Sequence, residues 1–217
     1  MLNNIKGVIF DLDGTLVDSM GVWAKIDVDY LNNLGYDVPP NLKEEITHLS
    51  FNEVAKYFRN RFNIEDSEEK IMETWHNMAY KEYEKNIKLK PGAKEFLKSL
   101  KDSKIKIGLA TSNSYPLLEV SLKSNGVFDL FDSITITSEV SRGKNFPDVY
   151  LLAAERLGLE PSECAVFEDI LPAIKGALSA GMKVFAVEDY TVSTEEREEI
   201  KKYAHKYIEN YNQLLIK

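Results

Sequence analysis

The chain has 217 residues, of which 44% are hydrophobic and 29% charged, so it is long enough to bury one core and carry a smaller second module. Its net charge of -8 disfavours nucleic acid and anionic membranes as partners, because both require a basic footprint. No stretch resembles a signal peptide or a membrane span. The single cysteine, Cys164, excludes an internal disulfide, so the expected location is the cytoplasm.

The first expected element is a buried strand that ends in two acids. Residues 8–10 form an unbroken apolar run, typical of a strand covered on both faces, and the chain continues Asp11-Leu12-Asp13-Gly14-Thr15. Ligands of open parallel sheets bind beyond the carboxyl ends of the strands, so Asp11 and Asp13 are expected to face that crevice. Two carboxylates so close together repel unless they share a cation, and oxygen ligands suit Mg²⁺.

Residues 18–86 carry only helical signals. Apolar residues at helical spacing predict helices at 23–34 and 42–47, a third opened by a capping box of Ser50 and Glu53, and a fourth that begins at Ser67. The same spacing favours Trp23 and Trp75 as core residues of this block. A four-helix block between two buried strands predicts an inserted domain over 18–86, with 1–17 and 87–217 forming the main domain.

From Lys90 onward, strand and helix patterns alternate. Strands are predicted at 104–110, 133–137, 165–167, 183–187 and 206–208, and helices at 93–100, 117–124, 149–157, 172–180 and 194–203. Such alternation implies right-handed crossovers and a parallel sheet covered on both faces. The predicted fold class is therefore α/β, with a Rossmann-like parallel sheet core and an inserted all-helical domain.

Three later stretches add polar groups near strand ends. Thr111-Ser112-Asn113 follows the predicted strand 104–110, Lys144 lies in the loop before Pro147-Asp148, and Glu168-Asp169 ends the strand 165–167. Each feature alone is common in solvated turns or helix caps. Together with the first acidic pair they converge on one edge of one sheet, which points to a catalytic site.

The stretch Asp-x-Asp-Gly-Thr-Leu-Val and the three later stretches, in this order, resemble the four motifs of the haloacid dehalogenase (HAD) superfamily of phosphohydrolases. The all-helical insertion between the first and second motifs is similar to the C1 cap arrangement of that superfamily. The resemblance implies a Mg²⁺-dependent phosphatase that hydrolyses a small phosphorylated metabolite through an aspartyl-phosphate intermediate.

The resemblance also assigns roles within the first motif. Asp11 is the expected nucleophile, because a carboxylate can attack phosphorus and split one displacement into two, and it is also a metal ligand. Asp13 is the expected general acid and base, and its backbone carbonyl is the implied metal ligand. Thr15 is expected to orient the Asp13 carboxyl through a hydrogen bond.

The later motifs supply the rest of the implied site. Thr111 is expected to bind phosphate oxygens together with groups at Ser112 and Asn113, and Lys144 is expected to neutralise the phosphoryl group. The metal ligands implied at the last motif are Asp169, directly, and Glu168, directly or through a water. The family pattern continues Lys-Pro-x-Pro-Asp after the lysine, and it has a serine and later a glycine after the acidic pair. This chain departs from it at Asn145, Phe146, Ile170 and Ala173.

The nearest alternative is a sugar phosphomutase similar to beta-phosphoglucomutase, which shares the four motifs and the cap class. Those enzymes carry a histidine where Trp23 aligns and an arginine near Leu49-Ser50-Phe51, so these positions favour a phosphatase. Arg59 or Arg61 could replace the missing arginine. A dehalogenase and a phosphonate-cleaving enzyme are disfavoured by the presence of Asp13, and a non-catalytic binding module by the intact acid set. Neither the substrate nor the oligomeric state follows from the sequence.

Overall fold

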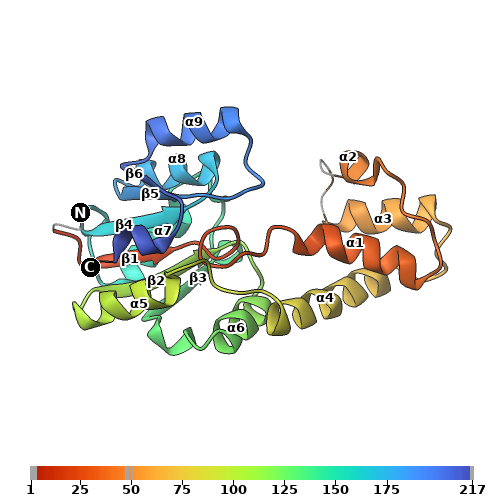
Figure 1. Cartoon of the computed structure of the whole chain (residues 1–217), viewed down its shortest axis with the longest axis horizontal. Coiled ribbons are helices and arrows are strands. Elements are labelled where there is room, and N and C mark those ends of the chain that lie inside the picture. Colours follow the sequence, from red (N-terminus) through yellow and green to blue (C-terminus); the bar gives the residue numbers. More distant parts are fainter. Residues whose placement is uncertain (1–3, 47–48, 50, 216–217) are drawn as a thin grey trace. The chain divides into compact units, whose positions relative to one another are not determined.

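A computed structural model describes residues 4–46, 49 and 51–215 (Figure 1). The chain divides into two compact units, one formed by Met1–Met20 with Ile87–Lys217 and the other by Gly21–Asn86. The first contains a sheet with helices, and the second contains helices. Each unit is described by itself below.

The first unit, here called the α/β unit, is built on a six-stranded parallel sheet in the order β3-β2-β1-β4-β5-β6. The strands are β1 (Gly7–Phe10), β2 (Lys106–Thr111), β3 (Ser133–Ile136), β4 (Cys164–Glu168), β5 (Lys183–Val187) and β6 (Lys206–Ile208). This confirms the predicted Rossmann-like parallel sheet. The chain runs outward from β1 to β3 and then returns to place β4 beside β1, so the sheet has its topological switch point between β1 and β4.

Helices cover both faces of this sheet. They are α5 (Ala93–Asp102), α6 (Tyr115–Ser124), α7 (Asp148–Leu157), α8 (Leu171–Ser179) and α9 (Thr194–Tyr203), with short 3-10 turns η1 (Phe128–Leu130), η2 (Thr137–Glu139), η3 (Pro161–Glu163) and η4 (Tyr211–Leu214). Because successive strand residues point to opposite faces, both faces of the central strands must be apolar. The strand sequences meet that requirement.

The two faces of the sheet differ in chemistry. One face packs aliphatic strand residues against α7, α8 and α9 in a single buried cluster that includes Ile9 and Val166. On the other face Phe167 stacks between Phe10 and Phe185, with ring centroids 5.0 Å apart in each pair. Tyr211 of η4 packs onto the Phe167 ring at 5.6 Å. Side chains therefore pack against both faces of the sheet near the carboxyl ends of β1 and β4.

The second unit, here called the helical unit, contains α1 (Val22–Asn33), α2 (Leu42–Ile46), α3 (Phe51–Arg61) and α4 (Glu68–Lys85). Ser67 caps α4 as expected, since its side chain accepts a hydrogen bond from the Lys70 amide at 3.3 Å. The predicted capping box at Ser50 lies outside the described residues. The core centres on Trp75, which packs edge-to-face on Phe58 at 5.0 Å and on Tyr30 at 5.6 Å.

The prediction that both tryptophans are core residues is correct for Trp75, which is 1% exposed, and wrong for Trp23, which is 40% exposed. The buried stripe of α1 contains Ile26 and Tyr30 as predicted, but its first member is Val22 and not Trp23. One residue is a rotation of about 100° on an α-helix, which is enough to turn Trp23 out of the core.

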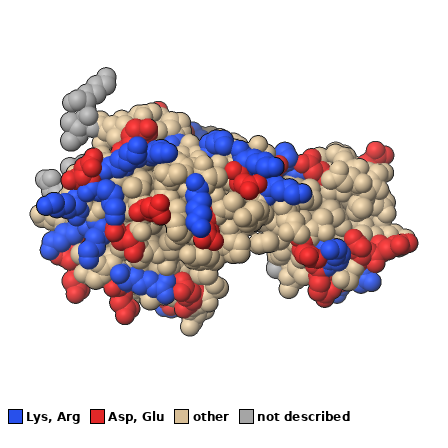
Figure 2. Space-filling model, turned by 90° about the horizontal axis from the view of Figure 1, so that it is seen from below, with Lys and Arg blue, Asp and Glu red and all other residues tan. Residues whose placement is uncertain are grey.

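Charge on the α/β unit is mixed. On the face shown in Figure 2, Lys and Arg are interspersed with Asp and Glu over this unit. Exposed ion pairs of the unit include Lys101 with Asp132 at 2.7 Å and Lys123 with Glu119 at 2.8 Å. Such pairs stabilise a fold by only about 0–1 kcal/mol each. Among the helices of the described residues, none is long and apolar enough to cross a membrane.

Candidate active site

The register of β1 and β4 brings the first and last motifs together. Phe10 lies opposite Phe167, and the Asp11 amide donates to the Phe167 carbonyl at 3.0 Å. Asp11 and Glu168 therefore occupy the same register position at the ends of neighbouring strands, beside the topological switch point. Open α/β sheets bind their ligands at this point.

Three buried carboxylates meet at this edge. Asp11, Glu168 and Asp169 each offer an oxygen within 4.8 Å of the others, and all three residues are buried. Burial, together with the nearby charge of Asp11, raises the pKa of Glu168 to about 7 and that of Asp169 to about 8. A divalent cation removes such repulsion, and a set of carboxylate oxygens is the donor set that hard cations prefer. These residues therefore fit a divalent metal ion.

Lys144 lies among the acids. Its ammonium group contacts Asp11 Oδ1 and donates to Glu168 Oε1 at 2.5 Å. Burial opposes the positive charge, but the two carboxylates outweigh it and hold the pKa of Lys144 above its usual value. The ammonium is therefore charged at neutral pH and lies where it can neutralise both a carboxylate and an anionic ligand.

The loop that carries Lys144 is closed by Arg142. The Arg142 guanidinium donates two hydrogen bonds to the Asp148 carboxylate, at 3.0 and 2.7 Å, and lies 4.3 Å from the centre of the Phe146 ring. Phe146 is one of the departures from the family pattern. It follows Asn145, which stands where the family has a proline, and its ring supplies a cation–π contact that orders the loop.

Gly176 of α8 packs closely against the backbone of the same loop. A Cβ atom at this buried position would overlap the Lys144 carbonyl oxygen and would lie 2.9 Å from that of Phe146. Only a residue without a side chain allows the helix to approach the loop backbone so closely.

We expect Gly176→Ala to lower kcat/KM for a phosphate monoester by roughly 100-fold, because a methyl group there displaces the Lys144 backbone and a shift of about 1 Å costs that much. The measurement is phosphate release, together with a thermal melt. Lys175→Ala, at the exposed neighbouring position, is the matched control and should retain activity. Full activity of folded Gly176→Ala protein would contradict the role of this contact.

Asp13 lies in a different environment from Asp11. Its carboxylate accepts a hydrogen bond from the Ser19 hydroxyl at 2.6 Å and another from the Asn113 side-chain amide at 2.8 Å. In the part of the chain that the structure describes, the group of acidic side chains able to share a metal comprises Asp11, Glu168 and Asp169 and does not include Asp13. The two carboxylates of the first motif therefore have different partners: Asp11 lies in the acid cluster, and Asp13 is held by Ser19 and Asn113.

Thr15 differs from the expectation. Its buried hydroxyl donates to Asp169 Oδ1 at 2.8 Å, whereas the resemblance implied a bond to Asp13. The cause is the turn at Gly14, where φ is +80° and the backbone passes so close to Asp169 that a Cβ atom would overlap its carboxylate. This turn aims Thr15 at the acid cluster, and Ser19 and Asn113 hold Asp13 instead.

Thr111 ends β2, the strand beside β1. Its buried hydroxyl accepts a hydrogen bond from the Asn113 amide at 3.0 Å, and the Asn113 side chain in turn accepts one from the Ser114 amide at 2.7 Å. Ser112 is exposed. This turn leads into the ten-residue helix α6, and the N-terminus of a helix suits an anion.

The structure adds two residues that the sequence analysis did not identify. The buried Tyr150 hydroxyl donates to Glu168 Oε1 at 2.9 Å, and burial, followed by the Glu168 charge, raises the pKa of Tyr150 well above its usual value. Ser19 is the other, as a partner of Asp13. No local pattern marks either residue, because Tyr150 reads as an ordinary apolar position of α7 and Ser19 as a turn residue.

The chain is similar to known proteins of one hydrolase family. The family model described as haloacid dehalogenase-like hydrolase matches residues 8–187. A protein of Drosophila melanogaster named probable pseudouridine-5'-phosphatase is 31% identical, over 90% of this chain and 87% of its own. A Thermotoga maritima protein named phosphorylated carbohydrates phosphatase is 28% identical, over 82% of this chain and 83% of its own.

Among solved structures, the chain resembles a putative beta-phosphoglucomutase from Thermotoga maritima, with a TM-score of 0.83 and 26% identity over 94% of each chain. The family generally uses a divalent metal, and the buried acid cluster of Asp11, Glu168 and Asp169 fits that requirement. The chain belongs to the haloacid dehalogenase-like hydrolase family, and it is a phosphoric monoester hydrolase of that family.

Proposed function

We propose that this protein is a Mg²⁺-dependent phosphatase that hydrolyses a small phosphorylated metabolite through an aspartyl-phosphate intermediate. The observation that carries the proposal is the separation of two carboxylates two residues apart. Asp11 lies against Lys144 in the buried acid cluster, while Asp13 is held by Ser19 and Asn113. Pairs of acids in different environments take different chemical roles.

In this mechanism the Asp11 carboxylate attacks phosphorus, and Lys144 neutralises the charge that the phosphoryl oxygens carry. Asp13 protonates the leaving oxygen and then removes a proton from the water that hydrolyses the acyl phosphate. The Thr111 hydroxyl and the Ser112 amide donate to the phosphoryl oxygens, while the Asn113 amide holds the Thr111 hydroxyl in place. Mg²⁺, held by carboxylates of the acid cluster, would supply further neutralisation of the phosphoryl group.

The buried partners keep this arrangement in place. Tyr150 and Lys144 both donate to Oε1 of Glu168, which fixes that carboxylate beside Asp11. Thr15 donates to Asp169. Each acid is thus oriented before substrate binds, and preorganised groups act without reorganisation during the reaction.

A sugar phosphomutase is the second candidate, because a structural relative has that name. The two arginines considered as replacements for the mutase arginine have partners within the helical unit. Arg59 lies 3.8 Å from Glu68, and Arg61 lies 3.4 Å from Glu45 and over the Tyr57 ring. Neither is an unpaired cation, so these contacts favour hydrolysis over transfer within a gripped sugar phosphate.

We assign substrate choice to the helical unit acting as a cap over residues 18–86, and we place the reaction in the cytoplasm, in keeping with the single buried thiol of Cys164. The names of the two relatives define two substrate classes to compare. One is a phosphorylated nucleoside that carries a nitrogen ring, and the other is a phosphorylated carbohydrate.

The test is phosphate release from a panel of nucleotides, flavin phosphate, sugar phosphates and polyol phosphates, with Mg²⁺ or with excess chelator. We expect release from at least one monoester, only with the metal. Conversion of beta-glucose 1-phosphate to glucose 6-phosphate, faster than hydrolysis and dependent on a bisphosphate primer, would favour the mutase. Release that persists in excess chelator would contradict the metal requirement.

A further inference from the structure

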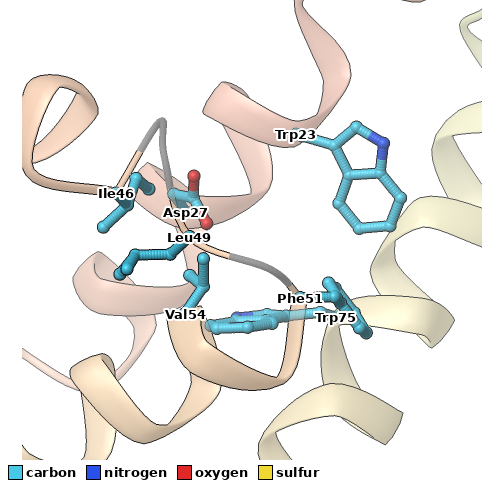
Figure 3. Close-up of a pocket in the computed structure, with 7 residues that line it drawn as sticks. All are labelled: Trp23, Asp27, Ile46, Leu49, Phe51, Val54 and Trp75. Atoms are coloured by element: carbon cyan, nitrogen blue, oxygen red, sulfur yellow. The ribbon is translucent and has the colours of Figure 1, made fainter.

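The helical unit contains a pocket of about 290 Å³ (Figure 3). Three aromatic rings line it, from Trp23, Phe51 and Trp75, and aliphatic side chains such as Val54 complete much of the wall. The volume lies near the lower end of the range for small-molecule sites, which is roughly 300–1,000 Å³. The pocket is therefore large enough for one ring system and too small for an extended ligand.

The three rings form connected walls. Phe51 lies 5.6 Å from Trp23, at 71° between ring planes, and 5.7 Å from Trp75, at 58°. Trp75 is packed from behind by the core and is 1% exposed, whereas Trp23 and Phe51 are 40% and 43% exposed. Two large rings that remain exposed beside a fixed third ring favour a flat apolar ligand, because stacking removes their faces from water.

One charged side chain, Asp27 of α1, faces the pocket among the described lining residues (Figure 3). No hydrogen bond or ion pair to its carboxylate is found within the described part of the chain, and burial raises its pKa to about 7. A partly buried acceptor that has no partner among the described residues is costly, and a ligand N–H group would satisfy it. The same charge repels a second phosphate or a carboxylate.

We propose that this pocket binds a planar nitrogen heterocycle, stacked on the aromatic rings and donating an N–H hydrogen bond to the Asp27 side chain. The pocket lies within the helical unit, and the compounds that it selects are the first to test as substrates, a step that rests on the proposed phosphatase function. A polyol fits less well, since its many hydroxyls would face mostly apolar walls with one charged side chain. The proposal thus selects the nucleoside-like class of substrate over the carbohydrate class.

The chain has two tryptophans, Trp23 and Trp75, and both line this pocket. Intrinsic tryptophan fluorescence of the full-length protein therefore reports on the pocket without any catalysis. We expect uridine, which has an imide N–H, to change the fluorescence in a saturable way, and ribose to leave it unchanged. 3-Methyluridine lacks that N–H and should bind about tenfold more weakly, the loss expected for one hydrogen bond to a charged group.

Variants separate the hydrogen bond from the general fold. Asp27→Leu removes the acceptor at similar size, and it should weaken uridine binding about tenfold and erase the difference between uridine and 3-methyluridine. Asp29→Asn is the matched control, because Asp29 lies two residues along the same helix and pairs with Lys25 at 2.7 Å. It should bind both ligands as the unmodified protein does.

The proposal is overturned if uridine, cytidine, adenosine and guanosine all leave the fluorescence unchanged at millimolar concentration, or if ribose and sorbitol change it as strongly as the nucleosides do. Equal binding of uridine and 3-methyluridine would overturn the assigned contact to Asp27. Nucleoside binding without Asp11-dependent phosphate release would reject the phosphatase and keep the pocket. Phosphate release without nucleoside binding would reject the pocket and keep the phosphatase.

Discussion

Asp11→Asn is expected to lower the rate of phosphate release by roughly 10⁴-fold or more, the scale seen when a catalytic nucleophile is removed. The amide keeps the shape of the side chain but is a poor nucleophile and cannot form the acyl phosphate. Lys144 retains Glu168 as a partner, so the site keeps an ion pair and the chain should still fold. Phosphate release under saturating substrate and Mg²⁺ measures the effect, and a thermal melt checks the fold.

Asp18→Asn is the matched control for this experiment, because Asp18 is an exposed acid on the same segment. It should retain nearly full activity. Substantial turnover by purified Asp11→Asn protein would exclude Asp11 as the nucleophile and, with it, the proposed aspartyl phosphate.

Asp13→Asn is expected to lower turnover of an alkyl phosphate by about 10²–10⁴-fold, through the loss of proton transfer. The side-chain oxygen can still accept the Ser19 hydrogen bond, but the new amide nitrogen cannot accept the one from Asn113, so two esters are compared to separate loss of the proton from a change of position. A nitrophenolate leaving group needs no proton. The first half-reaction of nitrophenyl phosphate should therefore be hurt much less, and hydrolysis of the acyl enzyme should become slow.

Rapid mixing of Asp13→Asn protein with nitrophenyl phosphate should show a burst of nitrophenolate followed by slow turnover. The measurement is the ratio of the variant's rate losses on the alkyl and nitrophenyl esters. Equal losses on the two esters, without a burst, would mean that Asp13 acts by position or charge and not as the general acid and base.

The sequence by itself predicted where the strands lie and that the acids follow the carboxyl ends of two of them. A buried strand is an unbroken apolar run, so the strands at 8–10 and 165–167 can be recognised from the local sequence. The predicted strand bounds 183–187 and 206–208 agree with the structure. Parallel strands end on a common edge, which is why Asp11 and Glu168 could be expected near each other before any coordinates. Helix starts with a capping side chain, such as Ser67, are equally local.

Only the tertiary structure decided which partners each side chain of the site contacts. Thr15 could have bonded the acid two residues before it, but its hydroxyl reaches Asp169, 154 positions away, because the turn at Gly14 packs against that residue. Trp23 has the spacing of a core residue but lines an open pocket, because Val22, one residue before it, takes the buried position at the start of α1. The spacing of residues along a helix determines which of them lie on the same face. Packing against segments that are distant in the sequence determines which face is buried.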